Sequence, residues 1–468
     1  MTQRGYGLNK SELTDTELKE LRAELTVQPF VPKDYQMNDG STSFKVFQES
    51  ASKIYLPKMY GLKKFGTPDV VKLNDGADIN IPFNGKLRNE QKEPTDAFLA
   101  AARDPTQMGG VLNMACAAGK TVMALYLIST LSKKTLVIVH KEFLLQQWRE
   151  RIQEFLPTAR IGLIKAQHVD VVDKDIVLGS LQSLSMKEYD DDVFNDFGTL
   201  VVDECHHTSA EVFSRALRKV NFKYSLGLSA TIQRKDGLTK VFMWYLGSVV
   251  YSATKRKGDV VTVKAVEYFD SHSAYSTECL MGRDKLNISR MINNICDFVP
   301  RTSKLMEIWH GVYEKEPKRR TLILSDRIVH LEKMGAILKD WNIPYGYYIG
   351  RMSDAELKKT ADEAIVILGT FQFCSEGFDV QGLDTLILAS PKSDIVQSVG
   401  RILRQKPEDR LHIPIVIDLM DMFSVFENQA KKRMKYYNKC GYDIEHEPLY
   451  PTDEQKDTPV IERGVCLL

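Results

Sequence analysis

The sequence lacks any long apolar run and any strong compositional bias. Of its 468 residues, 43% are hydrophobic and 27% are charged, which is ordinary for a globular protein. No stretch reaches the roughly 18 consecutive apolar residues of a membrane-spanning helix. The N-terminus from Met1 to Gly7 has no apolar core of the kind found in a secretory signal. We therefore expect a cytosolic protein with no membrane partner.

Clustered cysteines and an excess of one charge are also missing. The seven cysteines are scattered, without a Cys-x-x-Cys pair or a metal-like cysteine–histidine spacing, and stand at positions 116, 205, 279, 296, 374, 440 and 466. This pattern predicts reduced thiols rather than a disulfide framework or a zinc site. The net charge is only +1, which excludes a basic coat for nucleic acid. Any polyanion must therefore bind in a local groove.

What the sequence does contain is a candidate phosphate-binding loop, Met114-Ala-Cys-Ala-Ala-Gly-Lys-Thr121. A short apolar run precedes it and a helical apolar period follows it, which is the strand–loop–helix context that such a loop requires. Gly119 allows the turn that points backbone amides at phosphate oxygens, with Ala118 beside it. Lys120 can then reach the β- and γ-phosphates, and the hydroxyl of Thr121 can bind Mg²⁺.

The loop departs from the usual pattern G-x-x-x-x-G-K-[ST], because Met114 holds its first position. Ala117 also occupies a position that is often glycine. Taken alone, the stretch is compatible with an alanine-rich helix start that happens to contain Gly-Lys-Thr. The interpretation therefore depends on residues further along the chain.

The second constellation is Val201-Val-Asp-Glu-Cys-His-His207, where two adjacent carboxylates end a strand-like apolar run. In phosphoryl transfer, one carboxylate at a strand end can hold Mg²⁺ and its neighbour can orient or deprotonate the attacking water. Asp203 and Glu204 fit these two roles. An Asp-Glu pair is common on protein surfaces, but the combination of loop and pair predicts ATP and Mg²⁺ as ligands.

Strand-like runs alternate with helical segments in two series, which predicts an α/β protein with two parallel-sheet layers. The first series has runs at 135–139, 175–178, 199–202 and 224–228, and the second at 321–324, 364–368, 385–389 and 413–418. Only the first has a phosphate loop, so we expect one nucleotide held between the layers. The predicted divisions are residues 1–85 (an accessory domain), 86–252, 253–448 and a tail at 449–468.

The accessory region interleaves basic and aromatic side chains. Its lysines and aromatics between residues 44 and 66 are Lys45, Lys53, Lys58, Lys63, Lys64, Phe47, Tyr55, Tyr60 and Phe65. Basic residues with aromatics suit a phosphate backbone and exposed bases. A solvated lysine face over a small aromatic core explains the pattern equally well, and both interpretations stay open.

Taken together, these motifs resemble those of the superfamily 2 helicases, over residues 87 to 437. In the first layer, Leu87-Arg-Asn-Glu-Gln91 resembles the Q motif, which implies that Gln91 reads the adenine edge. The segments 137–148 and 179–183 are similar to strand-contacting motifs, and Ser229-Ala-Thr231 to motif III. The resemblance implies a small N-terminal DNA-binding domain at residues 1–85. It also implies two RecA-like domains in tandem, an ATP-binding domain at 86–252 and a helicase C-terminal domain at 253–448.

In the second layer, Leu324-Ser-Asp-Arg327 resembles motif IV, and Gly369-Thr370 with Ser375 to Asp379 resembles motif V, which implies that Gly377 and Asp379 face the nucleotide. Gln397-Ser-Val-Gly-Arg-Ile-Leu-Arg404 closely matches motif VI. Arg401 and Arg404 are expected one turn apart on a helix, from which they can neutralise charge on the transferring phosphoryl group.

The resemblance implies an ATP hydrolase coupled to DNA unwinding, most similar to the XPB-like and UvsW-like helicases of large double-stranded-DNA phages and viruses, and acting in the host cytoplasm if phage-encoded. It implies a monomeric motor on forks or Holliday junctions, in DNA recombination, repair or replication. The predicted nucleic-acid contacts are His140, Lys141, Ser180, Gln182, Arg327, Thr370 and Gln372. RNA, a double-strand translocase without strand separation, and a nucleotide-switched DNA-binding module remain as alternatives.

Overall fold

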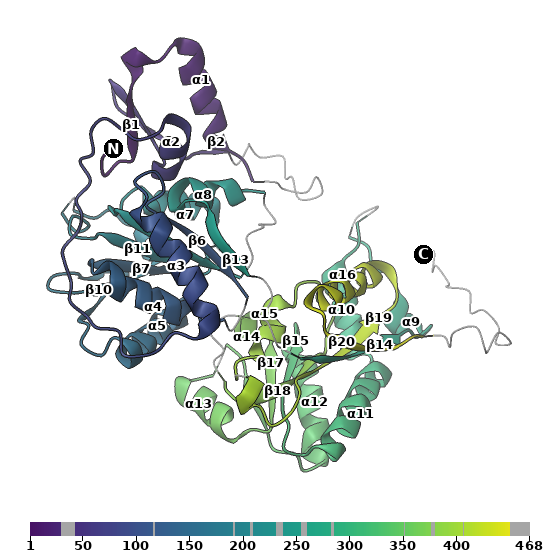
Figure 1. The fold of residues 1–468 in the computed structure, drawn as a ribbon. Coiled ribbons are helices and arrows are strands. Elements are labelled where there is room, and N and C mark those ends of the chain that lie inside the picture. The colour runs from purple at the N-terminus through teal and green to yellow at the C-terminus, as the bar shows by residue number, and fades with distance from the viewer. Residues whose placement is uncertain are drawn as a thin grey trace. The chain divides into compact units, whose positions relative to one another are not determined.

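The computed structural model describes residues 1–29, 43–115, 118–190, 192–205, 209–230, 237–253, 260–281, 285–350, 352–375, 380–405 and 407–449 (Figure 1). The chain divides into two compact units, Met1–Arg256 and Lys257–Leu468. Each is built around its own largely parallel sheet, as the two series of strand-like runs predict. None of the helices in the described ranges combines the length and the apolar character needed to cross a bilayer.

The first unit contains an eight-stranded sheet. In spatial order its strands are β13 (Val249–Ala253), β6 (Gly109–Met114), β12 (Tyr224–Ser229), β11 (Thr199–Val202), β7 (Thr135–Val139), β10 (Ile176–Ser180), β8 (Ile161–Lys165) and β9 (His168–Asp170). Only the β8–β9 pair is antiparallel. Every residue of β6, β7 and β11 is buried, because helices cover both faces of a parallel sheet.

Helices from two parts of the chain cover the two faces of this sheet. One face carries α3 (Asn89–Arg103), α4 (Lys120–Leu131) and α5 (Glu142–Phe155). The other carries α6 (Leu181–Met186), α7 (Ala210–Leu217) and α8 (Thr239–Leu246). Helix α7 shows the reason in its sequence: Phe213, Ala216 and Leu217 repeat at helical spacing and are all buried.

In its described residues, the N-terminal region contains two small antiparallel sheets, two α-helices and a short 3-10 helix at Lys10–Glu12. Its elements are β1 (Tyr6–Asn9), α1 (Asp15–Glu24), β2 (Thr26–Val27), β3 (Phe44–Lys45), β4 (Gln48–Glu49), β5 (Lys53–Leu56) and α2 (Lys58–Phe65). Helix α1 begins at a capping box in which Thr14 and Glu17 bond each other's backbone N–H. The region shares a hydrophobic core with α7 and α8, so it is part of the first unit rather than a free module.

The burial of the aromatic side chains bears on the two interpretations of this region. Phe47 and Tyr60 are 6% and 5% exposed, and the ring of Tyr60 packs edge-on against Trp244 of α8 at 5.4 Å. These two rings form the small aromatic core and cannot stack on bases. Tyr55 remains half-buried, and Phe65 is 38% exposed.

The second unit contains a seven-stranded parallel sheet. In spatial order its strands are β16 (Tyr345–Tyr348), β17 (Val366–Thr370), β15 (Arg320–Ser325), β18 (Leu383–Leu388), β19 (Ile415–Asp421), β14 (Thr262–Tyr268) and β20 (Asp443–Glu447). Helices α11 (Val299–Lys315) and α12 (Ile328–Asp340) cover one face. The other face is covered by α14 (Phe371–Ser375), α15 (Val396–Arg401) and α16 (Ser424–Cys440).

Three further α-helices lie in the described part of this unit. They are α9 (Ser273–Ser276), α10 (Ile288–Asp297) and α13 (Asp354–Glu363). Helices α9 and α10 form a small apolar cluster with the segment that leads into α16. The predicted tail beyond residue 449 lies outside the described residues.

Two buried ion pairs anchor β19 to helices on opposite faces of the sheet. Asp421 accepts hydrogen bonds from the Nε and Nη2 atoms of Arg301 at 2.5 and 2.8 Å, and the hydroxyl of Tyr275 donates to it at 2.8 Å. Asp418 accepts from Arg433 at 2.8 and 3.0 Å. Removing one partner of such a pair leaves an uncompensated charge in the core.

We predict that Arg301→Met destabilises the full-length protein by about 3 kcal/mol or more, because Asp421 is then buried without its cation. The double variant with Asp421→Asn should recover part of this loss. Urea denaturation measures both. The matched control is Lys333→Met, which breaks a surface ion pair to Asp297 and should cost under about 1 kcal/mol. Equal losses in the two single variants would contradict the assigned importance of the buried pair.

Candidate active site

The phosphate loop leads from β6 into the first turn of α4. Gly119, immediately before α4, has φ 78° and ψ 37°, the left-handed conformation that favours glycine. A Cβ atom at this position would lie 2.3 Å from Nε2 of Gln91 and 2.7 Å from Nη2 of Arg88. Gly119 is therefore required both by the backbone turn and by the close approach of the start of α3.

Gln91 is buried and holds this loop. Its Nε2 donates to the carbonyl oxygen of Ala118 at 3.0 Å, and its Oε1 accepts from the backbone N–H of Arg88 at 3.0 Å. The side chain is 1% exposed. In this structure Gln91 therefore ties the start of α3 to the phosphate loop, and its contact with adenine stays a prediction.

Asp203 lies directly after β11, with its carboxylate held by two donors. Oδ2 accepts from the indole Nε1 of Trp148 at 2.9 Å, and Oδ1 accepts from the backbone N–H of Glu204 at 2.9 Å. Trp148 comes from α5, is 1% exposed, and stands 55 positions away in the sequence. The sequence motifs give Trp148 no predicted role. Its place at the end of a motif-like stretch was the only signal.

Burial and a neighbouring negative charge dominate the electrostatics of Asp203. Burial, and after it the negative charge of Glu204, raise the pKa of the Asp203 carboxyl from 3.8 to about 6, although the Trp148 hydrogen bond and Lys120 act in the opposite direction. Glu204 itself has φ 45°, which is unusual for a residue with a side chain. Such strain is often found at functional sites, where the surrounding structure holds it in place.

The loop and the carboxylates meet at one edge of the sheet. In the sheet, β12 lies between β6 and β11, and all three run parallel, so their carboxyl ends share that edge. Nζ of Lys120 lies 3.4 Å from Oε1 of Glu204. The structure thus brings the phosphate loop and the Asp203–Glu204 pair together, as the sequence predicts.

The oxygen donors at this edge suit Mg²⁺. Asp203 offers a buried carboxylate and Thr121, half-buried at the start of α4, a hydroxyl, and Mg²⁺ prefers such hard oxygen ligands together with phosphate oxygens. A divalent cation would also relieve the cost of ionising Asp203, which its raised pKa expresses. The chemistry of these donors therefore fits the expected ion.

The nucleic-acid residues predicted in the first unit follow two adjacent parallel strands. His140 and Lys141 come after β7, and Ser180 and Gln182 come at the end of β10 and in α6, with Val139 paired to Ser180. Because neighbouring parallel strands end at the same edge, the two pairs occupy one border of the sheet. Their contact with nucleic acid stays a prediction.

The corresponding residues of the second unit also lie at strand ends. Thr370 ends β17, Gln372 follows in α14, and Arg327 precedes α12 after β15. The hydroxyl of Thr370 accepts from the N–H of Phe373 at 3.3 Å, as a turn cap does. The guanidinium of Arg327 donates to Asn293, to Ser289 and to the carbonyl oxygen of Asp326.

The arginine pair differs from the expected geometry. Helix α15 ends at Arg401, so Arg404 lies three residues beyond it and not one turn further along the helix. The chain turns away at Ile402 and Leu403, whose side chains are buried. Both arginines are half-buried. Gly377, Asp379 and Thr231 lie outside the described residues.

Comparison with known proteins defines the family. Residues 84–234 match the model of the type III restriction enzyme res subunit, and residues 301–406 match that of the helicase conserved C-terminal domain. A protein of Acanthamoeba polyphaga mimivirus, L396, is 34% identical over 97% of this chain and 88% of its own length. The chain belongs to the superfamily 2 helicases. It is an ATP-dependent helicase.

Two solved structures are similar to the helicase. The match to the DNA-bound restriction–modification enzyme LlaBIII covers 84% of this chain and 33% of the LlaBIII chain, with 19% identity and a TM-score of 0.53. At this identity the match shows a similar fold. The crystal structure of T4 UvsW covers 93% of this chain and 96% of its own, with 17% identity and a TM-score of 0.37. L396 is named provisionally as an ATP-dependent RNA helicase.

We predict that Trp148→Phe raises the Mg²⁺ concentration needed for nucleotide binding by about tenfold or more, because Asp203 loses the donor that orients it. Titrating Mg²⁺ against a fluorescent ATP analogue measures this. Trp309→Phe is the matched control: Trp309 is equally buried and donates to Thr321 at 2.9 Å in the second unit. If both variants need the same Mg²⁺ concentration, Trp148 has no orienting role.

A second prediction follows from the raised pKa of Asp203. Folding favours its protonated form, so its contribution to stability is fully present below its ordinary pKa of 3.8 and is lost as the pH rises through about 6. Asp203→Asn should therefore match the wild type near pH 4 and be more stable by up to ~2 kcal/mol near pH 7, in EDTA. Melting curves measured across this pH range test the prediction. A stability difference between Asp203→Asn and the wild type that shrinks as the pH rises would contradict it.

Proposed function

We propose that this helicase is an ATP- and Mg²⁺-dependent DNA helicase that unwinds or remodels branched DNA, such as forks and Holliday junctions, in recombination, repair or replication. The single observation that carries the enzymatic part is the 3.4 Å approach of Lys120 Nζ to Glu204 Oε1 at one edge of the first sheet. Asp203 lies beside them in a buried position. The arrangement supports in-line attack of water on a bound triphosphate.

The side chains divide the chemistry of hydrolysis. Lys120 neutralises charge on the β- and γ-phosphates, and Glu204 orients and deprotonates the attacking water. Asp203 and Thr121 would hold Mg²⁺, which supplies further neutralisation of the phosphate oxygens. We propose that Arg401 and Arg404 stabilise charge on the transferring phosphoryl group, the role that the family resemblance implies.

Translocation requires surfaces that hold the phosphate backbone and not the bases. In each unit, the candidate residues lie at the carboxyl ends of two adjacent strands, which are β7 and β10 in the first and β15 and β17 in the second. This repeated placement supports the proposal that both units grip one strand. Cycles of ATP binding and hydrolysis would then alternate the grip.

The preference for DNA rests on two observations. The first unit matches a restriction-enzyme model, and LlaBIII, similar in fold, is described as bound to DNA. The runs Arg234-Lys-Asp-Gly237 and Val416-Ile-Asp-Leu-Met-Asp421 favour the XPB-like and UvsW-like branch. The relation to a mimivirus protein supports a viral or phage source. The name of L396 favours RNA as the second candidate substrate.

We predict that Glu204→Gln lowers ATP turnover at least ~100-fold while ATP binding remains, because the variant keeps the shape but loses the general base. Steady-state hydrolysis with a parallel binding measurement tests this. The conservative control is Glu211→Gln on α7, an exposed carboxylate whose loss should change neither quantity. Unchanged turnover in Glu204→Gln would overturn the catalytic assignment.

The substrate is tested with labelled forks, tailed duplexes and four-way junctions made of DNA and of RNA. Release of strands from branched DNA, dependent on ATP, is the expected result. DNA-stimulated hydrolysis without strand release would indicate a double-strand translocase, and release from RNA alone an RNA helicase. Nucleotide-dependent binding without turnover would indicate a switched DNA-binding module.

A further inference from the structure

Helix α16, which packs over β19 in the second unit (Figure 1), carries a row of exposed lysines. They are Lys431, Lys432, Lys435 and Lys439. At 3.6 residues per turn, these side chains fall within about 100° of the helix circumference. The opposite side of the helix is its buried stripe, formed by Phe426, Ala430, Arg433 and Tyr437. The lysines therefore form one continuous surface, which we call the α16 lysine face.

The α16 lysine face carries charge of one sign. Glu427 is the only carboxylate in the sequence of α16, and it is half-buried in the first turn. Ion pairs among the described residues join other lysines of this unit, such as Lys333 and Lys392, to carboxylates, but none involves the four lysines of the face. The whole protein has a net charge of only +1, so the face is a local concentration of positive charge.

Helix stability does not explain this row of lysines. A solvated surface helix often mixes both signs of charge, as α1 and α13 do. In α16, Lys431, Lys435 and Lys439 follow one another at the i,i+4 spacing, where like charges destabilise a helix. The helix dipole favours Lys439 in the last turn but not Lys431 near the middle. A polyanionic ligand would turn this repulsion into attraction.

The carboxylates of the neighbouring edge strand do not neutralise the face. Ile444 of β20 packs against the same apolar cluster as α16. Side chains alternate along a strand, so the exposed carboxylates of β20 point to the other face of the sheet. They are Asp443, Glu445 and Glu447, and Glu445 pairs there with Lys264 at 3.1 Å. Glu267, on the α16 side, already accepts from the backbone N–H of Leu449 at 3.2 Å and lies 3.1 Å from the ring of His446.

The backbone beneath the lysines is firmly anchored. Arg433 donates to the two carboxylate oxygens of Asp418 at 2.8 and 3.0 Å, and the hydroxyl of Tyr437 donates to Asp418 at 2.9 Å. Arg433 also donates to the carbonyl oxygen of Lys392 at 2.6 Å, which ties α16 to the loop after β18. The lysine stems therefore project from a fixed helix, and a ligand does not have to order the backbone when it binds.

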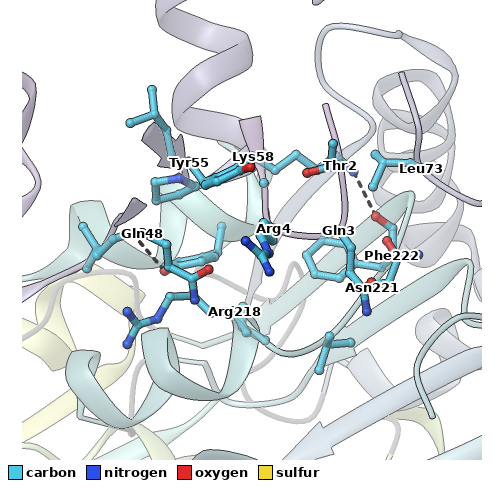
Figure 2. Close-up of a pocket in the computed structure, with 17 residues that line it drawn as sticks. Thr2, Gln3, Arg4, Gln48, Tyr55, Lys58, Leu73, Arg218, Asn221 and Phe222 are labelled. Atoms are coloured by element: carbon cyan, nitrogen blue, oxygen red, sulfur yellow. Dashed lines mark hydrogen bonds between the residues drawn. The ribbon is translucent and has the colours of Figure 1, made fainter. Parts of the chain in front are cut away.

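A second group of cations, in the first unit, is less suited to a ligand. Arg4, Lys58 and Arg218 line a hollow between the N-terminal region and residues 217–222 (Figure 2). Its cavity volume is about 30 Å³, which leaves room for water and not for a larger ligand. Lys58 is 6% exposed, and burial lowers the pKa of its ammonium group to about 7. The exposed lysines of α16 therefore form the stronger surface for an anion.

We propose that the α16 lysine face binds the phosphate backbone of a duplex arm of the nucleic acid on which the helicase acts. Lys431 to Lys439 cover about 12 Å of helix axis. One strand of B-DNA presents roughly three or four phosphates over that length.

A duplex suits the face better than a single strand. Unstacked bases bind to aromatic rings, but none of the exposed residues of α16 is aromatic. Besides the four lysines, these are Asn428 and Asn438. The inference rests on the proposed function for the identity of its ligand, and it adds a surface outside the strand ends at which the other candidate contacts lie.

The test uses the full chain without nucleotide. The variant Lys431→Gln/Lys435→Gln/Lys439→Gln removes three cations from the face, and replacing the same three lysines by arginine keeps their charge. The matched control is Lys315→Gln/Lys318→Gln/Lys339→Gln, which removes three exposed cations of the same unit near the amino ends of β15 and β16. Melting curves confirm that each variant is folded.

Fluorescence anisotropy follows labelled blunt duplexes of DNA and of RNA, and a DNA single strand of the same sequence. At about 0.1 M salt, the glutamine variant of the face should bind duplex at least ~tenfold more weakly, and its slope of log affinity against log salt should fall by ~2.7, which is about 0.9 for each lost phosphate contact. The arginine variant and the matched control should bind duplex within about twofold of the wild type, and single-strand affinity should change by less than about threefold.

A loss with both duplexes, or with one of them, supports the proposal and shows whether DNA, RNA or both are held. Equal binding of both duplexes by the glutamine variant and the matched control would overturn it, as would a wild type that binds neither duplex. An equal loss with the single strand would overturn the assignment to a duplex. Binding of blunt ends needs neither hydrolysis nor strand release, so turnover in Glu204→Gln and unwinding of junctions test the proposed function separately.

Discussion

The ionic contact between Lys120 and Glu204, with Asp203 buried beside it, is the feature on which the rest of the first unit depends. Three charged groups at the edge of a dry sheet are costly unless they compensate one another. Lys120 offsets the carboxylates, and Trp148 and a backbone N–H hold Asp203. The site is therefore ready for further cationic charge, because the raised pKa of Asp203 shows that the compensation is incomplete.

The parallel sheet explains how residues distant in sequence reach this edge. Strands β6, β12 and β11 run side by side in one direction, so the residues after each strand gather at their carboxyl ends. The buried side chains of β6 and β11 fix the strands between two layers of helices. The reactive residues come directly after these strands in the sequence, so they do not have to contribute to the core. The same principle orders the candidate nucleic-acid contacts in both units.

The N-terminal region is integrated with the motor through its core. Tyr60 packs on Trp244, and the hydroxyl of Tyr245 donates to the carbonyl oxygen of Val46 at 3.3 Å. A shared core of this kind transmits changes in α8 to the N-terminal strands more directly than a linker would.

From the sequence alone, both sheets, the order of most of their strands along the chain, the phosphate loop and the Asp203–Glu204 pair could be predicted, because apolar periodicity and short motifs are local properties. The sequence did not predict that α15 ends before Arg404. The spacing of Arg401 and Arg404 suits one helix, but the helix ends at Arg401, where the buried side chains of Ile402 and Leu403 follow. The sequence also did not predict the contact between Trp148 and Asp203, which are 55 positions apart, or that between Gln91 and Ala118, 27 positions apart. The hollow around Arg4 joins residues more than 200 positions apart and was not predicted either. Only the packing of strands and helices determines which distant side chains meet.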